Sequence, residues 1–279
     1  MADPLLTRLW RAAIAVFALA VTGGAAAQDL LPGLQPFAAK GELVVAVIDR
    51  DAPPMIMTGE DGGPRGFDIQ LINAFSKSLR IPLRIVRTAK TYDELIAQVA
   101  GGDADIAISN LSRSTQRALY VRFTRPYMRQ NPTLLVNRAR NIRYAKDCPN
   151  ARQVARLLAT EGAVAVQRGT FYEELARQLA PDTEPTAFDD FADLAAGVRA
   201  GSLSISLQGE ILARTYLNDN PAARIYVRLC EIAEWEDQIA IAVRPDAPEL
   251  VDLLDIFLEN RKVSVDAETV VLRIDRWGF

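Results

Sequence analysis

The feature that most constrains the fold is an alternation of short apolar runs with amphipathic segments. In the first half of the chain, runs at 43–48, 83–86 and 105–108 have the length and composition of buried strands. The segments 67–79 and 91–99 between them space their apolar residues as one face of a helix does. Strand and helix in strict alternation predict a parallel sheet with helices on its faces.

The same alternation begins again after a polar stretch, which predicts a second α/β lobe. Helices are expected at 154–159, from Thr170 onward, at 191–200, at 210–217 and at 249–258 (capped by Asp246), and strands at 163–167, 203–207 and 224–227. Apolar runs at 133–137 and 239–243 are predicted to cross between the lobes. The fold class is therefore α/β with two lobes joined by two hinge strands. Residues 28–136 with 241–279 form the expected first lobe, and 137–240 the second.

The first 27 residues are predicted to be a secretory signal peptide. They contain two arginines, a ten-residue apolar run at 12–21 and three alanines ending at Ala27, which is typical of cleavage before Gln28. The apolar run is short for a membrane span, which needs about 20 residues, although a membrane anchor is the alternative. The chain is therefore expected to be exported, to a bacterial periplasm.

Composition narrows the possible chemistry. The chain has no histidine, which excludes Ser-His-Asp triads, Cys-His dyads and histidine zinc sites. Its net charge of −3 does not suggest a nucleic-acid partner. No cofactor and no metal site is expected. Because export leads to an oxidising compartment, the two cysteines, Cys148 and Cys230, are predicted to form a disulfide.

A polar segment directly after the 105–108 strand is the strongest candidate for binding chemistry. It contains Asn110, Ser112 and Arg117, so that hydroxyls, free amides and a guanidinium converge as they do around a bound carboxylate. A capped surface helix is the competing interpretation. Thr170 follows a strand of the second lobe in the same way, as a cleft residue or as a structural N-cap with Glu173 in a capping box.

Other residues leave their roles more open. Tyr92 begins a helix, where its ring could stack on a ligand or pack in the core. Glu210 and Asp237 are isolated carboxylates, and no acid/base pair emerges from the spacing of the acidic residues. No catalytic residue is predicted.

Six short motifs occur in order between residues 41 and 278. They are Gly66-Phe67-Asp68-Ile69, Tyr92-Asp93-Glu94-Leu95-Ile96, Gly102-Asp103-Ala104-Asp105, Ser112-Arg113-Ser114-Thr115-Gln116-Arg117, Phe123-Thr124-Arg125-Pro126-Tyr127 and Val166-Gln167-Arg168-Gly169-Thr170. In this order and spacing they resemble the periplasmic solute-binding proteins of family 3, the amino-acid-binding type of ABC transporter substrate-binding protein.

The resemblance implies a type II periplasmic binding protein whose two lobes close over a small ligand. It assigns to Arg117 the clamp on the ligand's α-carboxylate. Asn110, Ser112 and Thr170 contribute further hydrogen bonds, and Tyr92 packs on the ligand. It also implies that a monomer presents its closed form to an inner-membrane ABC permease.

The chain departs from the family pattern where relatives hold an α-ammonium group. An aspartate is common at the position of Gly209, and an aromatic residue at that of Ala52. A buried ammonium without an anionic partner would cost several kcal/mol. The ligand is therefore either a carboxylate without an α-amino group or an amino acid held by Glu210 or Asp51.

The leading hypothesis is a binding protein, not an enzyme, that captures a small carboxylate-bearing solute. One alternative is an enzyme on the same fold that resembles cyclohexadienyl dehydratases, with Glu210 or Glu173 as its acid. Another is a periplasmic accessory or sensor protein that binds a protein partner.

Overall fold

The structure is a computed structural model that describes residues 31–160, 162 and 164–272. The predicted signal peptide lies outside these residues. Gly33–Phe279 forms one compact unit, separate from Met1–Pro32, and is described by itself. Within the described part of the chain, every helix is too short or too polar to span a bilayer.

The first of two five-stranded sheets contains the predicted parallel core. Its order is β4 (Leu83–Ala89), β1 (Leu43–Ile48), β5 (Ile106–Ala107), β14 (Ala242–Val243) and β6 (Arg122–Phe123). β1 pairs in parallel with β4 and β5, whereas β14 is antiparallel to β5 and β6. Because β14 follows the entire second sheet in sequence, the chain returns to complete the first.

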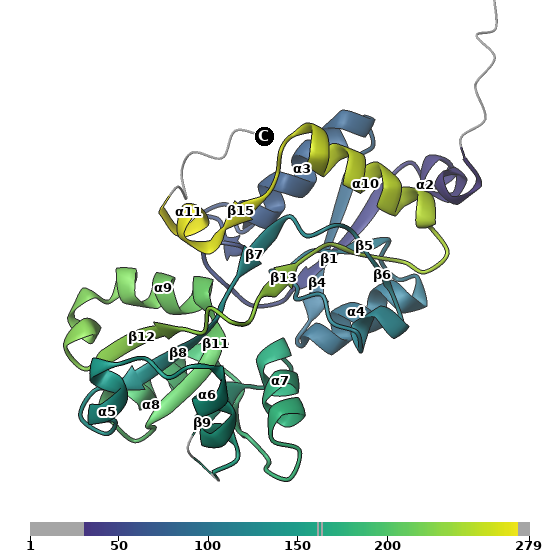
Figure 1. The fold of residues 1–279 in the computed structure, drawn as a ribbon. Helices are drawn as coiled ribbons and strands as arrows, with labels where there is room; N and C mark the ends of the chain where they lie inside the picture. Colours follow the sequence, from purple (N-terminus) through teal and green to yellow (C-terminus); the bar gives the residue numbers. More distant parts are fainter. Residues whose placement is uncertain (1–30, 161, 163, 273–279) are drawn as a thin grey trace, which may run out of the picture. The chain divides into compact units, whose positions relative to one another are not determined.

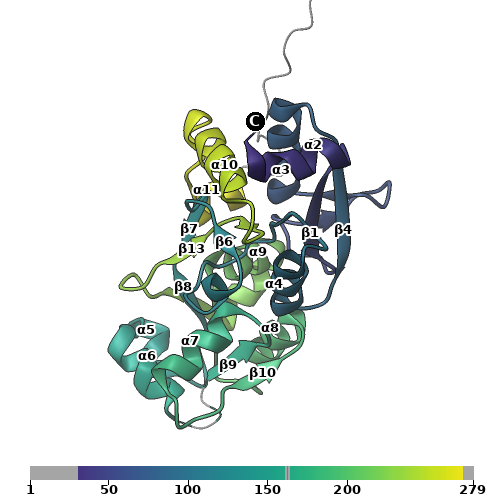
Figure 2. The ribbon, with the colours of Figure 1, turned by 90° about the vertical axis from the view of Figure 1, so that its right-hand side faces the viewer.

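Helices cover this sheet and close the first core. They are α2 (Gln35–Lys40), α3 (Phe67–Leu79), α4 (Tyr92–Gly101) and α10 (Pro248–Asn260). Figures 1 and 2 show α4 nearer the second sheet than α3 and α10 are. Asp246 does not cap α10 as predicted, because its carboxylate accepts from the Arg244 guanidinium and Ala247 takes the N-cap position.

The second sheet has the order β10 (Thr186–Phe188), β9 (Val164–Gln167), β11 (Ile205–Gly209), β8 (Pro132–Asn137) and β12 (Val227–Glu231). Its helices are α5 (Ile142–Lys146), α6 (Ala151–Leu158), α7 (Phe171–Leu179), α8 (Phe191–Ala200) and α9 (Glu210–Asp219). β8 is buried on both faces: Leu134 and Val136 pack in one core cluster, and Leu135 in another. The strand predicted from 224 was wrong, since Pro221–Ile225 forms a 3-10 helix before β12.

Two strands carry the chain between the sheets, as Figure 1 shows. β7 (Met128–Gln130) and β13 (Asp237–Ile239) pair antiparallel, with β15 (Val265–Asp266) on the other edge of β7. The prediction that 133–137 crosses between the lobes was wrong, because β8 pairs with β11 and β12 inside the second sheet. The predicted boundary at 136/137 therefore falls inside β8. We therefore propose that the lobes divide at β7 and β13.

Shorter elements complete the described chain. They are the hairpin β2 (Met57–Thr58) and β3 (Pro64–Arg65), α11 (Ala267–Leu272), and the 3-10 helices Pro32–Leu34 and Arg117–Leu119. The hairpin leads into α3 through Gly66. Gly66 has a φ of 123°, and a Cβ added there would lie 2.3 Å from the Met55 carbonyl oxygen. Only glycine therefore fits at this position.

The predicted disulfide is present and links Cys148 to Cys230 across 82 residues. Cys230 lies on β12 and is buried, whereas Cys148 precedes α6. The bond therefore ties the outer strand of the second sheet to the segment that leads into α6.

We expect the double substitution Cys148→Ser with Cys230→Ser to lower the free energy of unfolding by about 2–4 kcal/mol, because the bond restricts the unfolded chain. Denaturant unfolding measures this loss, and the wild type in reductant is the matched control. Equal unfolding midpoints for oxidised and reduced wild type would contradict the expectation.

Candidate functional site

Five of the seven predicted ligand-binding residues line one small cavity between the lobes. They are Tyr92, Asn110, Ser112, Arg117 and Thr170. The cavity has a volume of about 20 Å³, which is the room for about one water molecule. Residues far apart in sequence and from both sheets therefore meet at one point, as the motif order implied.

Arg117 is a buried cation at the start of the short 3-10 helix after β5. One terminal nitrogen donates to the Ser112 carbonyl at 2.9 Å, and Cζ lies 5.5 Å from the centre of the Tyr92 ring. Among the described residues, no carboxylate lies within ion-pair distance of its guanidinium, although the side chain is only 6% exposed. The remaining guanidinium donors are consequently available to an anion.

Asn110 is held in the left-handed region, with φ of 49°, by the start of α3. Its backbone N–H donates to Asp68 Oδ2 at 2.6 Å, and the Tyr127 hydroxyl donates to Asp68 Oδ1 at 2.7 Å. Burial raises the pKa of Asp68 to about 7, against the lowering effect of these two hydrogen bonds. Within the described chain, the side-chain oxygen of Asn110 is buried without a hydrogen-bond partner.

Asp237 is the centre of a hydrogen-bond cluster behind the cavity. Its Oδ2 accepts from the Tyr172 hydroxyl at 2.6 Å, Ser112 Oγ at 3.0 Å and Gln130 Nε2 at 3.1 Å. Its Oδ1 is buried and has no partner among the described residues. Burial raises the pKa of Asp237 to about 6, although the three donors and the Arg117 charge favour the carboxylate. Burial and Asp237 raise the pKa of Tyr172, which therefore stays a donor.

Thr170 stands at the N-cap of α7, but the predicted capping box is wrong. Its hydroxyl donates to the Gln167 carbonyl at 2.7 Å, so it does not accept from the helix amides. Glu173 Oε2 accepts from the Gly169 N–H instead. Thr170 nevertheless lines the cavity from the second lobe.

Asp51 and Glu210, the predicted ammonium holders, do not line this cavity. Asp51 is about half exposed and accepts from Arg87 and Thr58. Glu210 accepts from the Arg214 guanidinium at 2.6 Å and from the Asn131 N–H at 3.2 Å. Both carboxylates are thus engaged in contacts of their own.

Gly209 lies at the end of β11, where two side chains approach its backbone: Gln130 from hinge strand β7 and Tyr172 from α7. A Cβ at this position would lie 2.8 Å from the Tyr172 hydroxyl and 2.9 Å from Gln130 Oε1. These two side chains therefore fill the space that an aspartate side chain would need at this position.

Sequence reasoning missed several polar cavity residues, namely Gln130, Gln167, Tyr172 and Gln208, and treated Asp237 as isolated. Asp237 lies opposite Gln130 in the β7–β13 pairing. Both hinge strands are short and largely polar, so they were not recognised as apolar runs, and neither they nor their register had a sequence signal.

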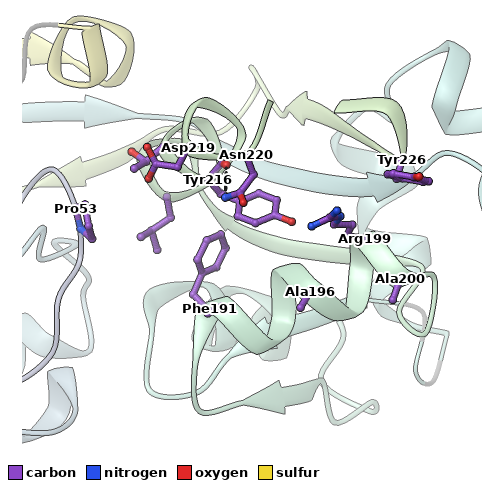
Figure 3. A pocket seen from close by; sticks show the side chains of 12 residues that line it. Pro53, Phe191, Ala196, Arg199, Ala200, Tyr216, Asp219, Asn220 and Tyr226 are labelled. Atoms are coloured by element: carbon purple, nitrogen blue, oxygen red, sulfur yellow. Dashed lines mark hydrogen bonds between the residues drawn. The ribbon is translucent and has the colours of Figure 1, made fainter. Parts of the chain in front are cut away.

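A larger cavity of about 820 Å³ lies over α8 and α9 (Figure 3). The rings of Phe191 and Tyr216 meet edge to face at its wall, and Leu212 lines both this cavity and the small one. It contains none of the predicted binding residues and is mostly apolar. We therefore place the candidate solute site in the small cavity, where the buried Arg117 guanidinium meets polar side chains from both sheets. The described residues contain no cluster of three or more possible metal ligands.

We expect the wild type to lose stability as the pH rises from 5.5 to 7.5. Because the pKa of Asp68 is raised in the folded state, its contribution is complete below pH 4 and is lost as the pH rises through about 7. Each of the two raised carboxyls contributes at most about 1.4 kcal/mol per pH unit to the slope. Asp237 contributes only up to about pH 6, and the chain has no histidine to titrate in this range.

Asp68→Asn should flatten the dependence between pH 6 and 7.5, since the amide accepts from Asn110 and donates to Tyr127 without a charge. Denaturant titrations at four pH values measure the slope. If the variant keeps the wild-type slope, Asp68 does not titrate between pH 6 and 7.5 and the expectation is wrong.

Comparisons with known proteins identify the family of the chain. Residues 44–269 match the bacterial extracellular solute-binding proteins, family 3. A "probable histidine-binding protein" of Neisseria gonorrhoeae is 23% identical over 260 residues, which are 92% of this chain and 91% of the relative.

Two further matches differ in extent. The membrane-bound lytic murein transglycosylase F of Maricaulis maris is 28% identical over 140 residues, but the match spans only 28% of that enzyme's length. An amino acid ABC transporter substrate-binding protein from Streptococcus pneumoniae, solved with L-arginine, has a TM-score of 0.68. It is 22% identical, with 86% of this chain and 97% of that chain covered.

The structural likeness confirms the predicted fold, a two-lobed type II periplasmic binding protein. The family match covers most of the chain, from the first strand of the first sheet to α11. The chain therefore belongs to the bacterial extracellular solute-binding proteins of family 3, and its role is to bind a solute.

Proposed function

We propose that the small cavity binds a carboxylate-bearing solute, an amino acid or a related compound, and that Arg117 receives the carboxylate. The main support is that the guanidinium of Arg117 is buried and has no anionic partner among the described residues. A buried charge is stable only when a counter-charge and hydrogen bonds replace its lost hydration. A carboxylate matches the planar fork of an arginine in both charge and geometry.

Residues from both lobes support the proposal. Ser112, Asn110 and Tyr92 belong to the first lobe, and Thr170 and Tyr172 to the second. Because the cavity has room for about one water molecule, a solute enters only when these walls separate. Contacts to both walls would then favour the closed form over the open one, as a ligand must do to shift such an equilibrium.

The relatives favour an amino acid, since those named above include a histidine-binding protein and a substrate-binding protein solved with L-arginine. The same relationship supports an inner-membrane ABC permease as the partner and export to the periplasm. We expect the protein to act as a monomer.

The dehydratase-like alternative requires an acid that is free to donate a proton. Glu173 accepts from Arg177 at 2.8 Å and from the Gly169 N–H at 2.6 Å, and Glu210 is bound by Arg214 and Asn131. These contacts favour carboxylates that hold helix ends together. That the chain is not an enzyme remains a prediction, for which turnover of prephenate or arogenate is the test.

The function is tested by a thermal-shift screen with the common L-amino acids, their deaminated analogues and small dicarboxylates. A solute at 100 times its dissociation constant adds about 2.7 kcal/mol to the free energy of unfolding. No shift with any of these compounds would contradict the proposal and favour the accessory-protein alternative.

For a solute found in this screen, we expect Arg117→Ala to weaken binding by at least about 30-fold, because the carboxylate loses its buried counter-charge. Isothermal titration calorimetry measures the change. Arg113→Ala is the matched control, since Arg113 lies in the same segment but is exposed. Micromolar affinity retained by the Arg117 variant would remove this residue from the site.

A further inference from the structure

We propose that Asp237, on hinge strand β13, receives the cationic group of the solute, so that the site selects a zwitterion over the corresponding deaminated acid. This inference rests on the proposed function and adds the anionic half of the site. It replaces the earlier assignment of that half to Asp51 or Glu210.

The two carboxylate oxygens of Asp237 differ in their hydrogen bonds. Oδ2 of Asp237 accepts three hydrogen bonds, whereas Oδ1 is buried with no partner in the described residues. A buried carboxylate oxygen without a donor is costly, because it has lost its water and gained nothing in exchange. An ammonium group offers the charge and the N–H donors that this oxygen lacks.

Asp237 does not line the cavity itself but lies one hydrogen bond behind its wall. All three donors to its Oδ2 come from residues that line the cavity, namely Ser112, Gln130 and Tyr172. Tyr172 belongs to α7 of the second lobe, and its hydroxyl bonds to Asp237 across the hinge. Separation of the lobes would withdraw this hydroxyl and open the carboxylate to the entering solute.

Asn110 has a second buried acceptor that lacks a donor. The side-chain oxygen of Asn110 is buried without a partner in the described chain, and Asn110 lines the cavity. An ammonium group has three N–H donors, so it can bond to Asn110 Oδ1 and to Asp237 together. Arg117 lines the cavity and Asp237 lies one hydrogen bond behind its wall, so the site has one positive and one negative group, the complement of a zwitterion.

The two carboxylates proposed from the sequence do not meet these conditions. Asp51 and Glu210 accept from arginines of their own, whereas the donors to Asp237 are residues that line the cavity. At Gly209 an acidic side chain would collide with Tyr172 and Gln130. In this chain the anionic group therefore lies on the hinge and not at the β11–α9 junction.

The test compares Asp237→Asn with the wild type by calorimetry, using L-glutamate against glutarate and L-alanine against propionate. In each pair the two compounds differ only by the α-ammonium group. We expect the wild type to bind at least one amino acid tenfold or more tightly than its partner. The variant should lose this preference, while its affinity for the deaminated acid changes less than threefold.

Asp105→Asn is the matched control, because Asp105 is equally buried but pairs with Lys40 and Arg244 in the first lobe. It should keep the wild-type preference. Binding of the deaminated acid and a cooperative melting curve show that the Asp237 variant is folded.

The outcomes separate this inference from the proposed function. A variant that keeps the tenfold preference overturns the role of Asp237. A wild type that binds glutarate or propionate as tightly as the amino acids overturns the zwitterion inference and leaves the carboxylate site in place. A wild type that binds none of the four compounds, nor any in the wider screen, overturns both.

Discussion

The antiparallel pairing of β7 with β13 is the constraint on which the rest of the structure depends. These strands carry the chain out of the first sheet and back, and they bring Gln130 opposite Asp237. Gln130 also accepts from the Ile211 N–H at the start of α9 at 3.2 Å. This pair of short hinge strands therefore contacts both a helix of the second lobe and the residues around the cavity.

Groups that are costly to bury lie in the cavity wall and behind it. Arg117 is buried without an ion pair among the described residues, and burial raises the pKa of both Asp68 and Asp237. Each group is held in place by hydrogen bonds to the backbone or to neighbouring side chains. This arrangement lowers the stability of the protein without ligand, because the buried charges are not fully compensated. A bound solute would supply the missing partner.

Most of the first sheet and its helices could be predicted from the sequence. β1, α3 and α4 lie where apolar periodicity placed them, since their burial follows directly from the spacing of their side chains. Predictions that depended on a single polar residue were less successful. Asp246 and Thr170 took other hydrogen-bond partners than the expected helix amides, because several acceptors compete for each donor at a helix start.

Local pattern and motif order were enough to predict the α/β class, the family, the disulfide and the position of Arg117 after a strand end. Which carboxylate stands beside the cavity depends instead on the packing of distant segments. Asp237 lies 120 positions after Arg117 in the chain, and its approach depends on strand register and on the space left by Gly209. Register and steric exclusion are properties of packed neighbours, so no local pattern reports them.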